Sequence, residues 1–506
     1  MAAEFMLNPG GERTDVTAAV SLFTPGLAGT VRAHLPGPAG VRDDSLGTPV
    51  LDAALAQAGW QEEVTLELEA EELPGAVPPD GDVRAPGGEE GLALEVSAGD
   101  EYGAVVLLQD EAGGLTWHFP LADDDQIAPP TRGGGVLRFR IPRTAVEPPE
   151  GQDGGTRSLL GMAARKILKV LLYPLADRVL GSIGDKLAAR WEAKNRPYRL
   201  RTFTPENYRQ EAAEELTEAG WQRLQSGRAL LFIHGTFSQA HSGFGGLPVS
   251  TMEALHEQYD GRLFAFDHFT LSDSPADNAQ RFLEAMPPGT RLELDIICHS
   301  RGGLVARTLA EAPPKVEGRE FKVRRVVFAG VPNNGTALAD GAHIVSFLDR
   351  YTSAINLVPI PWVADILGTI LVAVELVGHG LLAGLPGLQA MLPGKVSLNR
   401  VAGEACEYYA LTADFDPVRT AVATVVRRSA QQAAMMAGDA LMDAVFGKAA
   451  NDLVVPTEGV YAPNGSPNFP LPAARIHRFA PADQVTHVGF FQHPLTGDKL
   501  IAWLRG

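Results

Sequence analysis

The sequence places a serine where an apolar strand would turn sharply into a helix. Ser300 lies in the run CHSRGG (298–303), which follows the apolar stretch 292–297 and precedes a helix-like pattern. In such a turn the hydroxyl projects from the carboxyl end of a buried strand, beside the free N–H groups of the next helix. Gly302 suits this turn because only small residues fit two positions from the serine, whereas Cys298 adds bulk where glycine is usual. The pattern indicates a nucleophilic serine, and its alternative is a helix N-cap in another α/β fold.

Strand and helix patterns alternate on both sides of this serine. From about residue 198 onward they follow one another in the order of an α/β domain. Connections of this length imply a parallel sheet with right-handed crossovers. Besides the strand before Ser300, the expected strands are 228–233, 262–267, 323–329, 408–412 and 475–479, and the expected helices are 204–224, 251–259, 275–286 and 496–504.

The serine segment resembles the nucleophile elbow of α/β-hydrolases. With His299 and the double glycine 302–303 it is most similar to bacterial lipases and esterases, and residues 330–336 resemble the lipase G-x-P-x-x-G-T turn. The resemblance covers residues 228–506. It implies an α/β-hydrolase fold and a serine ester hydrolase that works through an acyl-enzyme without a metal or an organic cofactor. A phospholipase or acyltransferase using the same residues remains an alternative, as does a non-catalytic binding protein on this scaffold.

The resemblance also implies an acid and a base for the serine, since a serine hydroxyl needs both to become a nucleophile. In this family the acid and then the histidine follow the serine along the chain. Asp452 lies in NDLVVP (451–456), which resembles the N-D-x-x-V-P segment that carries the lipase acid, and His487 lies between the last strand and the last helix. The alternative acids are Asp414 and Asp416, and the weaker candidates for the base are His477 and His493.

An oxyanion hole is implied next to the first strand of the α/β domain. HGTF (234–237) follows that strand, and by position the backbone N–H groups of Thr236, with Phe237 as the alternative, and of Arg301 would bind the developing negative charge. His234 is expected to shape this loop and not to act as the base. Gly235 would complete the H-G pair that the resemblance places there.

Two long insertions interrupt the expected sheet, at 337–401 and 418–446. The first is apolar over 355–363 and 366–385, but prolines and charged residues interrupt it, which argues against a transmembrane helix. We expect a helical cap or lid that walls an acyl pocket, or else additional core packing. The second insertion is expected to be helical and to line the same cavity or to mediate assembly. An acyl ester or a lipid is the substrate class that such walls suit.

The N-terminal residues predict a different, β-rich unit. Residues 1–55 are rich in Gly, Pro and Ala and are expected to form a poorly structured or strand-contributing extension. Residues 56–150 show period-two alternation between Gly, Pro and Asp clusters, which indicates a small all-β sandwich-like accessory domain. Residues 151–200 are expected to hold a linker, centred on 146–156, and a basic amphipathic helix at 159–191. The catalytic α/β domain would then occupy 201–506.

The basic helix at 159–191 has two interpretations. Arg165, Lys166 and Lys169 would share one face and a row of leucines the other. Such a helix usually docks on its own protein, but it can also lie on an anionic membrane surface or contact a protein partner.

Composition excludes some functions. The chain has 506 residues, enough for two or three domains, and a formal net charge of −18, which argues against nucleic-acid binding. Its two cysteines, Cys298 and Cys406, provide no disulfide framework and fit a reducing compartment. The first residues show no signal-peptide pattern, so a cytoplasmic protein is expected, with 159–191 as the segment that could reach a membrane surface.

Overall fold

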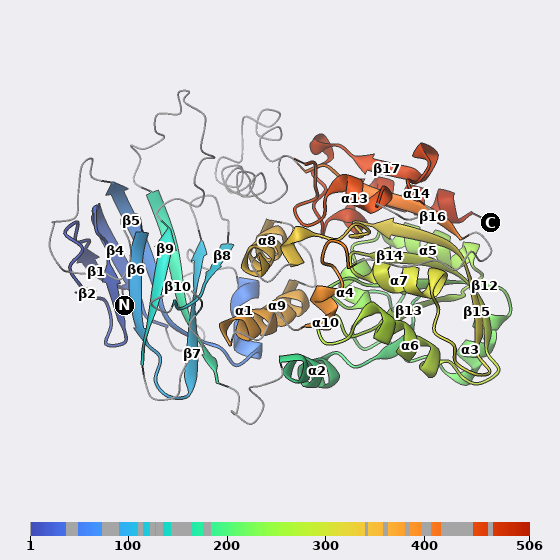
Figure 1. Cartoon of the computed structure of the whole chain (residues 1–506), viewed down its shortest axis with the longest axis horizontal. Helices are drawn as coiled ribbons and strands as arrows, with labels where there is room; N and C mark the ends of the chain where they lie inside the picture. Colours follow the sequence, from blue (N-terminus) through green and yellow to red (C-terminus); the bar gives the residue numbers. More distant parts are fainter. Residues whose placement is uncertain are drawn as a thin grey trace.

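The computed structural model describes most of the chain, and Figure 1 shows a β-rich N-terminal part beside an α/β part, with inserted helices between them. The described residues are 2–36, 49–72, 91–109, 115–121, 127, 135–142, 164–175, 184–339, 343–357, 363–379, 385–395, 406–415, 449–463 and 469–505. The expected linker 146–156, the second insertion 418–446 and Asp416 lie outside these residues.

A seven-stranded sheet organises the C-terminal part. Its order is β11-β13-β12-β14-β15-β16-β17, and all neighbours pair in parallel except β11, which is antiparallel to β13. The strands are apolar on both faces because helices cover both faces of a parallel sheet. The expected parallel sheet is confirmed and is consistent with an α/β-hydrolase fold. Its strands are β11 (Arg199–Thr202), β12 (Arg228–Ile233), β13 (Leu263–Asp267), β14 (Arg291–His299), β15 (Glu320–Ala329), β16 (Glu407–Ala413) and β17 (Ile476–Phe479).

Two apolar cores lie on the two faces of this sheet. In β12, Leu231 belongs to one core and Phe232 to the other, as the alternation of side chains along a strand requires. Helices α3 (Glu218–Gln225), α6 (Pro275–Ala285) and α7 (Gly302–Glu311) contribute to the first core, together with the inserted helices described below. Helices α4 (Ala240–Phe244), α5 (Val249–Gln258) and α14 (Pro494–Leu504) contribute to the second.

The prediction of a helix at 204–224 is wrong over most of that range. Only α3 is helical, and it begins after Thr217, whose side chain accepts a hydrogen bond from the N–H of Gly220. Before it, the chain runs back along the edge strand β11, where the N–H of Leu216 donates to the carbonyl of Leu200. Backbone groups used in this pairing are not available to a helix, so tertiary contacts override the helix-start signal at 204–206.

The N-terminal part consists of two packed β-sheets. One has the order β1-β4-β5-β10-β7-β8 and the other β2-β3-β6-β9. Their facing side chains share one core, with Val31 and Leu66 from the first sheet and Leu94 and Phe139 from the second. The strands are β1 (Ala2–Met6), β2 (Thr14–Asp15), β3 (Val20–Phe23), β4 (Leu27–His34), β5 (Gln61–Glu72), β6 (Gly91–Ser97), β7 (Tyr102–Gln109), β8 (Leu115–His118), β9 (Val136–Pro142) and β10 (Ala164–Pro174).

These sheets extend beyond the expected bounds of 56–150. Residues 2–34, expected as an extension, supply β1 to β4, and β10 adds a strand from the far side of the expected linker. A short helix, α1 (Pro49–Gln57), connects β4 to β5 and packs against the C-terminal part. We therefore use the name sandwich for the two sheets formed by β1 to β10.

The prediction of a basic amphipathic helix at 159–191 is wrong for residues 164–174. These residues form β10, a central strand between β5 and β7. Leu168 and Val170 point into the sandwich core, while Leu171 points to the other face and the buried Lys169 is paired with Asp52 at 3.0 Å. Burial on both faces produces an apolar run that periodicity alone cannot distinguish from a helix. The basic helix face that was expected to reach a membrane surface or a partner therefore does not form in residues 164–174.

The remaining described part of that range, α2 (Gly184–Asn195), is a helix docked on its own protein. The buried carboxylate of Glu192 accepts hydrogen bonds from the backbone N–H groups of Thr270, Leu271 and Ser272, at 2.5 to 3.0 Å. Charged hydrogen bonds of this kind fix the helix against the loop that follows β13.

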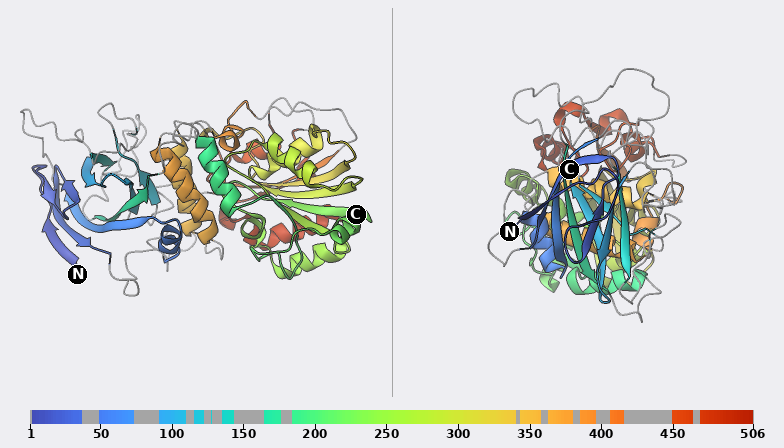
Figure 2. Two further views of the ribbon diagram at one scale, coloured as in Figure 1. Left: turned by 90° about the horizontal axis from the view of Figure 1, so that it is seen from below. Right: turned by 90° about the vertical axis from the view of Figure 1, so that its left-hand side faces the viewer.

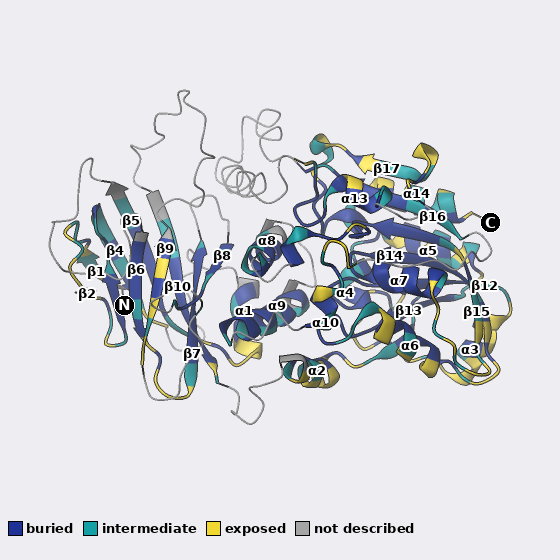
Figure 3. Cartoon of the chain, viewed as in Figure 1, coloured by how far each residue is buried: buried dark blue, intermediate teal, exposed yellow. Residues whose placement is uncertain are grey.

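The described residues of the insertion 337–401 are mostly helical. Its helices are α8 (Ile344–Leu357), α9 (Val363–Gly378) and α10 (Pro386–Gln389). Figure 2 shows α8 and α9 between the sandwich and the seven-stranded sheet, and Figure 3 shows that both are largely buried. Among the described helices, none is long and apolar enough to cross a membrane.

Candidate active site

The backbone at Ser300 forms a tight strand-to-helix turn. Ser300 has a φ of 49°, a conformation that costs energy for a residue with a side chain, and it lies between the end of β14 and the start of α7. Its N–H donates to the carbonyl of Ala329 at 2.9 Å. A Cβ at Gly302 would lie 2.3 Å from the carbonyl oxygen of His234, so only glycine fits there. The turn has the features of a nucleophile elbow.

Cys298 occupies the position where glycine is usual. Its side chain is fully buried, and its thiol lies 3.4 Å from the carbonyl oxygen of Val327, on the neighbouring strand. Burial raises the pKa of this thiol well above its ordinary value, which keeps it protonated and unreactive. The extra bulk is thus accommodated between strands.

The structure brings Ser300, His487 and Asp452 together from three separate segments. The Nε2 atom of His487 lies 2.9 Å from the Oγ of Ser300, and its Nδ1 lies 2.9 Å from the Oδ2 of Asp452. The N–H of His487 also donates to the carbonyl of Asp452 at 2.8 Å. A nucleophile, a base and an orienting acid are therefore connected by hydrogen bonds.

Asp452 is fixed by its own loop. Its Oδ1 accepts hydrogen bonds from the N–H groups of Val454 and Val455 at 3.0 and 2.8 Å, so Oδ2 is left to face the imidazole. The carboxylate is buried, with 1% of the residue exposed.

The alternative acid and bases are engaged elsewhere. Asp414 pairs with Arg478 at 2.8 Å, in a partly exposed position. His493 accepts a hydrogen bond from the N–H of Leu495 at the start of α14, and His477 lies in β17 against Phe479.

Two backbone N–H groups near Ser300 have no protein acceptor among the described residues. A Cβ at Gly235 would lie 2.7 Å from the Cβ of Ser300, which shows how closely the loop 234–237 approaches the serine. Within the described residues, the N–H groups of Thr236 and Arg301 donate to no protein acceptor, whereas the N–H of Phe237 donates to the Thr270 hydroxyl at 3.4 Å. This difference favours Thr236 over Phe237 as an oxyanion donor.

The Arg301 side chain points away from the site. Its guanidinium donates to the backbone carbonyls of Gly387, Phe269 and Asp273, and burial lowers its pKa to about 10. Only the backbone of this residue is thus offered to a substrate.

His234 and His299 are buried, neutral supports. The Nε2 of His234 accepts the backbone N–H of His268 at 3.1 Å, so its Nδ1 carries the proton and donates to the carbonyl of Gly235 at 3.0 Å. The Nε2 of His299 donates to the carbonyl of His487 at 2.8 Å. Burial lowers the pKa of His234 to about 4 and that of His299 to about 3. These bonds tie the His234 ring to the backbone on both of its nitrogens.

Tyr351, from the inserted helix α8, completes the surroundings of the site. Its hydroxyl donates to the carbonyl of Thr236 at 3.3 Å, and its ring centroid lies 5.8 Å from that of His487. The sequence did not single it out, because one tyrosine in an apolar insertion carries no motif. Ser300 is only 3% exposed in this arrangement. No cluster of three or more potential metal ligands occurs among the described residues.

Comparisons with known proteins give one family and several distant structures. The model of a family described as "Domain of unknown function (DUF7379)" matches residues 195–505. Among curated proteins none matches the chain.

Three of the similar solved structures come from bacteria, and their similarity to this chain is low. EstA of Clostridium botulinum has a TM-score of 0.36 and 12% identity, covering 54% of this chain and 86% of its own. Lipase 1 of Pelosinus fermentans has a TM-score of 0.34 and 14% identity, covering 55% and 98%. The mature lipase BlEst2 of Bacillus licheniformis has a TM-score of 0.30 and 17% identity, covering 55% and 91%. At these TM-scores the overall similarity supports no conclusion about function. A proposal about function therefore has to rest on the strand order and the geometry of the site.

Proposed function

The chain belongs to the family described as "Domain of unknown function (DUF7379)", and within it we propose that this protein is a serine hydrolase that cleaves carboxylic esters through an acyl-enzyme. The observation that carries the proposal is the chain of two 2.9 Å hydrogen bonds from Ser300 through His487 to Asp452, set at a strained strand-to-helix turn.

The first half-reaction would use all three side chains. His487 takes the proton of Ser300 as its oxygen attacks the ester carbonyl, and Asp452 holds the imidazole in the tautomer that leaves Nε2 free to accept it. His487 then gives this proton to the departing alcohol, leaving the acyl group on Ser300. Water, activated by the same histidine, releases the acid and restores the serine.

The negative charge that develops on the carbonyl oxygen would be bound by two backbone donors. The N–H groups of Thr236, beside the close approach of Gly235 to Ser300, and of Arg301, the residue after Ser300, have no protein acceptor among the described residues. Each donor of this kind contributes about 2.7 to 4 kcal/mol to transition-state binding in comparable sites. The main-chain position of both donors explains why the Arg301 side chain can be used elsewhere.

An ester with an apolar acyl chain, small or lipid, suits the surroundings of the site. Phe237 lies in the loop 234–237, which we call the oxyanion loop. Its ring packs against those of Phe347 and Tyr351, which both belong to the inserted helix α8. With Ser300 only 3% exposed, we propose that the inserted helices form a cap that walls the acyl site. The sandwich would be an accessory part without catalytic residues.

The experiment is a series of p-nitrophenyl esters of increasing acyl length, tested on the wild-type protein and on Ser300→Ala. Each buried methylene contributes about 0.8 kcal/mol, so two more methylenes should raise kcat/KM about tenfold until the acyl site is filled. Ser300→Ala should abolish turnover while the protein stays folded by circular dichroism. Turnover retained in this variant would refute the proposal, and a maximum at acetate would refute the apolar acyl site.

A further inference from the structure

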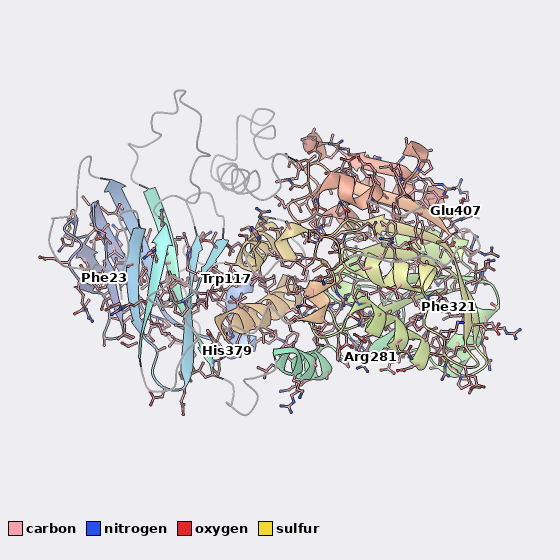
Figure 4. All side chains as sticks on the ribbon, in the orientation of Figure 1. Phe23, Trp117, Arg281, Phe321, His379 and Glu407 are labelled. Atoms are coloured by element: carbon pink, nitrogen blue, oxygen red, sulfur yellow. The ribbon has the colours of Figure 1, made fainter. Side chains whose placement is uncertain are left out.

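The inserted helix α8 contacts the candidate active site with one side and the sandwich with the other. With 3.6 residues per turn, Phe347 and Tyr351 share one side of α8, whereas Asp349 and Ser353 lie on roughly the opposite side. Figure 4 labels Trp117 on the sandwich at the place where it meets this helix. The helix thus forms a physical connection between two parts of the chain.

On the side of the site, Tyr351 touches both functional loops. Its hydroxyl donates to the carbonyl of Thr236, and its ring stands edge-on to Phe237, with 5.1 Å between centroids, and to His487, with 5.8 Å. The carbonyl of Phe237, the residue after Thr236, accepts a hydrogen bond from the buried guanidinium of Arg196 at 3.1 Å. Two successive carbonyls of the oxyanion loop are therefore held by side chains from outside that loop.

On the side of the sandwich, α8 covers the edge strand β8. The backbone N–H of Trp117 donates to Asp349 at 2.7 Å, its indole N–H donates to Thr352 at 3.0 Å, and the Ser353 hydroxyl exchanges hydrogen bonds with the N–H and carbonyl of Leu115 at 3.0 Å each. An edge strand offers unpaired backbone groups, and here side chains of a helix satisfy them. These bonds fix the rotation and height of α8 against the sandwich.

We propose that Tyr351 is a positioning residue for the oxyanion hole and that the sandwich, through its hydrogen bonds to α8, holds Tyr351 in place. Fixing the Thr236 carbonyl restricts the rotation of the residue whose N–H is to bind the oxyanion. The inference rests on the proposed ester hydrolysis. It gives the sandwich a function, because loss of the hydrogen bonds between β8 and α8 would free Tyr351 and with it the loop 234–237, which stabilises the transition state.

Tyr351→Phe tests the first link, because it removes the hydroxyl and keeps the ring. The oxyanion forms only in the transition state, so kcat for a p-nitrophenyl ester should fall about three- to tenfold with KM changed less than about twofold. This fall corresponds to about 0.6 to 1.4 kcal/mol. The rate of labelling by a fluorophosphonate, which also places an oxygen in the hole, should fall by a similar factor.

Tyr208→Phe is the matched control. Tyr208 is a buried tyrosine of the same part of the chain, and its hydroxyl donates to the backbone carbonyl of Leu247 at 2.8 Å, away from the site. Both variants should lower the melting temperature, but only Tyr351→Phe should lower kcat and the labelling rate. Equal kcat values in the two variants would refute the role of Tyr351.

Asp349 tests the second link. Asp349→Ala removes the acceptor for the Trp117 N–H and should lower kcat, whereas Asp349→Asn keeps an oxygen acceptor and should retain the wild-type kcat. In a Tyr351→Phe background Asp349→Ala should have little further effect on kcat, since both changes act through the same hydroxyl. Fully multiplicative effects, or an Asp349→Ala variant with wild-type kcat, would refute control by the sandwich.

These outcomes are separable from a failure of the proposed function. A wild-type protein that neither hydrolyses esters nor reacts with the fluorophosphonate would refute the hydrolase and, with it, the role of Tyr351. A wild-type protein that reacts, together with a Tyr351→Phe variant that reacts equally fast, would refute the role of Tyr351 alone.

Discussion

Replacing Asp452 by asparagine should reverse the tautomer of His487. The loop after Asp452 decides which way the new amide faces, because the N–H groups of Val454 and Val455 both donate to Oδ1. An amide nitrogen placed there would meet two donors, so the amide oxygen has to occupy that site and the NH2 group has to face Nδ1 of His487. Nδ1 would then accept a hydrogen bond, and the ring proton would move to Nε2, which faces Ser300.

A histidine protonated at Nε2 cannot take the proton of the serine. In the serine-protease template the same change of tautomer lowers kcat by about 10⁴, and the similar geometry here predicts a loss of about three to four orders of magnitude. Folding should be affected much less, since the amide keeps the two backbone hydrogen bonds and the shape of the carboxylate.

The assay is steady-state hydrolysis of a p-nitrophenyl ester, with the rate of fluorophosphonate labelling as a second readout. Asp414→Asn is the control, because Asp414 pairs with Arg478 in a partly exposed position, where ion pairs contribute about 0 to 1 kcal/mol. An Asp452→Asn variant within tenfold of the wild-type kcat, or an Asp414→Asn variant that loses more, would refute the assignment of the acid.

Two further predictions concern the surroundings of the site. Gly235→Ala should reduce kcat at least tenfold, because its Cβ would lie 2.7 Å from the Cβ of Ser300 and would displace the oxyanion loop; unchanged kinetics would contradict this packing. Burial raises the pKa of Asp349 to about 8 from 3.8. Between about pH 4 and 8 the folded protein therefore keeps a proton that the unfolded chain releases. The free energy of unfolding falls as pH rises through this window, by up to about 1.4 kcal/mol per pH unit. The side chain of an Asp349→Asn variant cannot titrate. Its free energy of unfolding, measured with urea, should exceed that of the wild type by an amount that grows as pH rises from about 4 to 8. A difference that stays constant with pH would contradict the burial of a protonated carboxyl.

The sequence predicted the α/β part well because its signals are local. Buried parallel strands read as short apolar runs, and the turn at Ser300 needs glycine at 302, where a Cβ would lie 2.3 Å from a backbone carbonyl oxygen. The order of Ser300, Asp452 and His487 came from a resemblance, and the structure brings these residues within hydrogen-bonding distance.

The sandwich was harder to delimit because its strands come from distant parts of the chain. The central strand β10 is buried on both faces, which removes the alternation that identifies a half-buried strand. Its basic residues then suggested a polar helix face, although Lys169 is buried beside Asp52.

Tyr351 was not predicted for a related reason. Its role depends on contacts with Thr236 and His487, which lie more than a hundred residues away in the sequence. The same holds for Trp117, whose bonds to α8 cross from the sandwich to the insertion. Long-range side-chain to backbone contacts leave no periodic pattern that could be read in advance.

Mass spectrometry of the protein after reaction with a fluorophosphonate identifies the nucleophile. We expect one adduct per chain, located at Ser300 by peptide mapping, and none in a folded Ser300→Ala variant. An adduct on another residue, or an unreacted and folded wild-type protein, would contradict it.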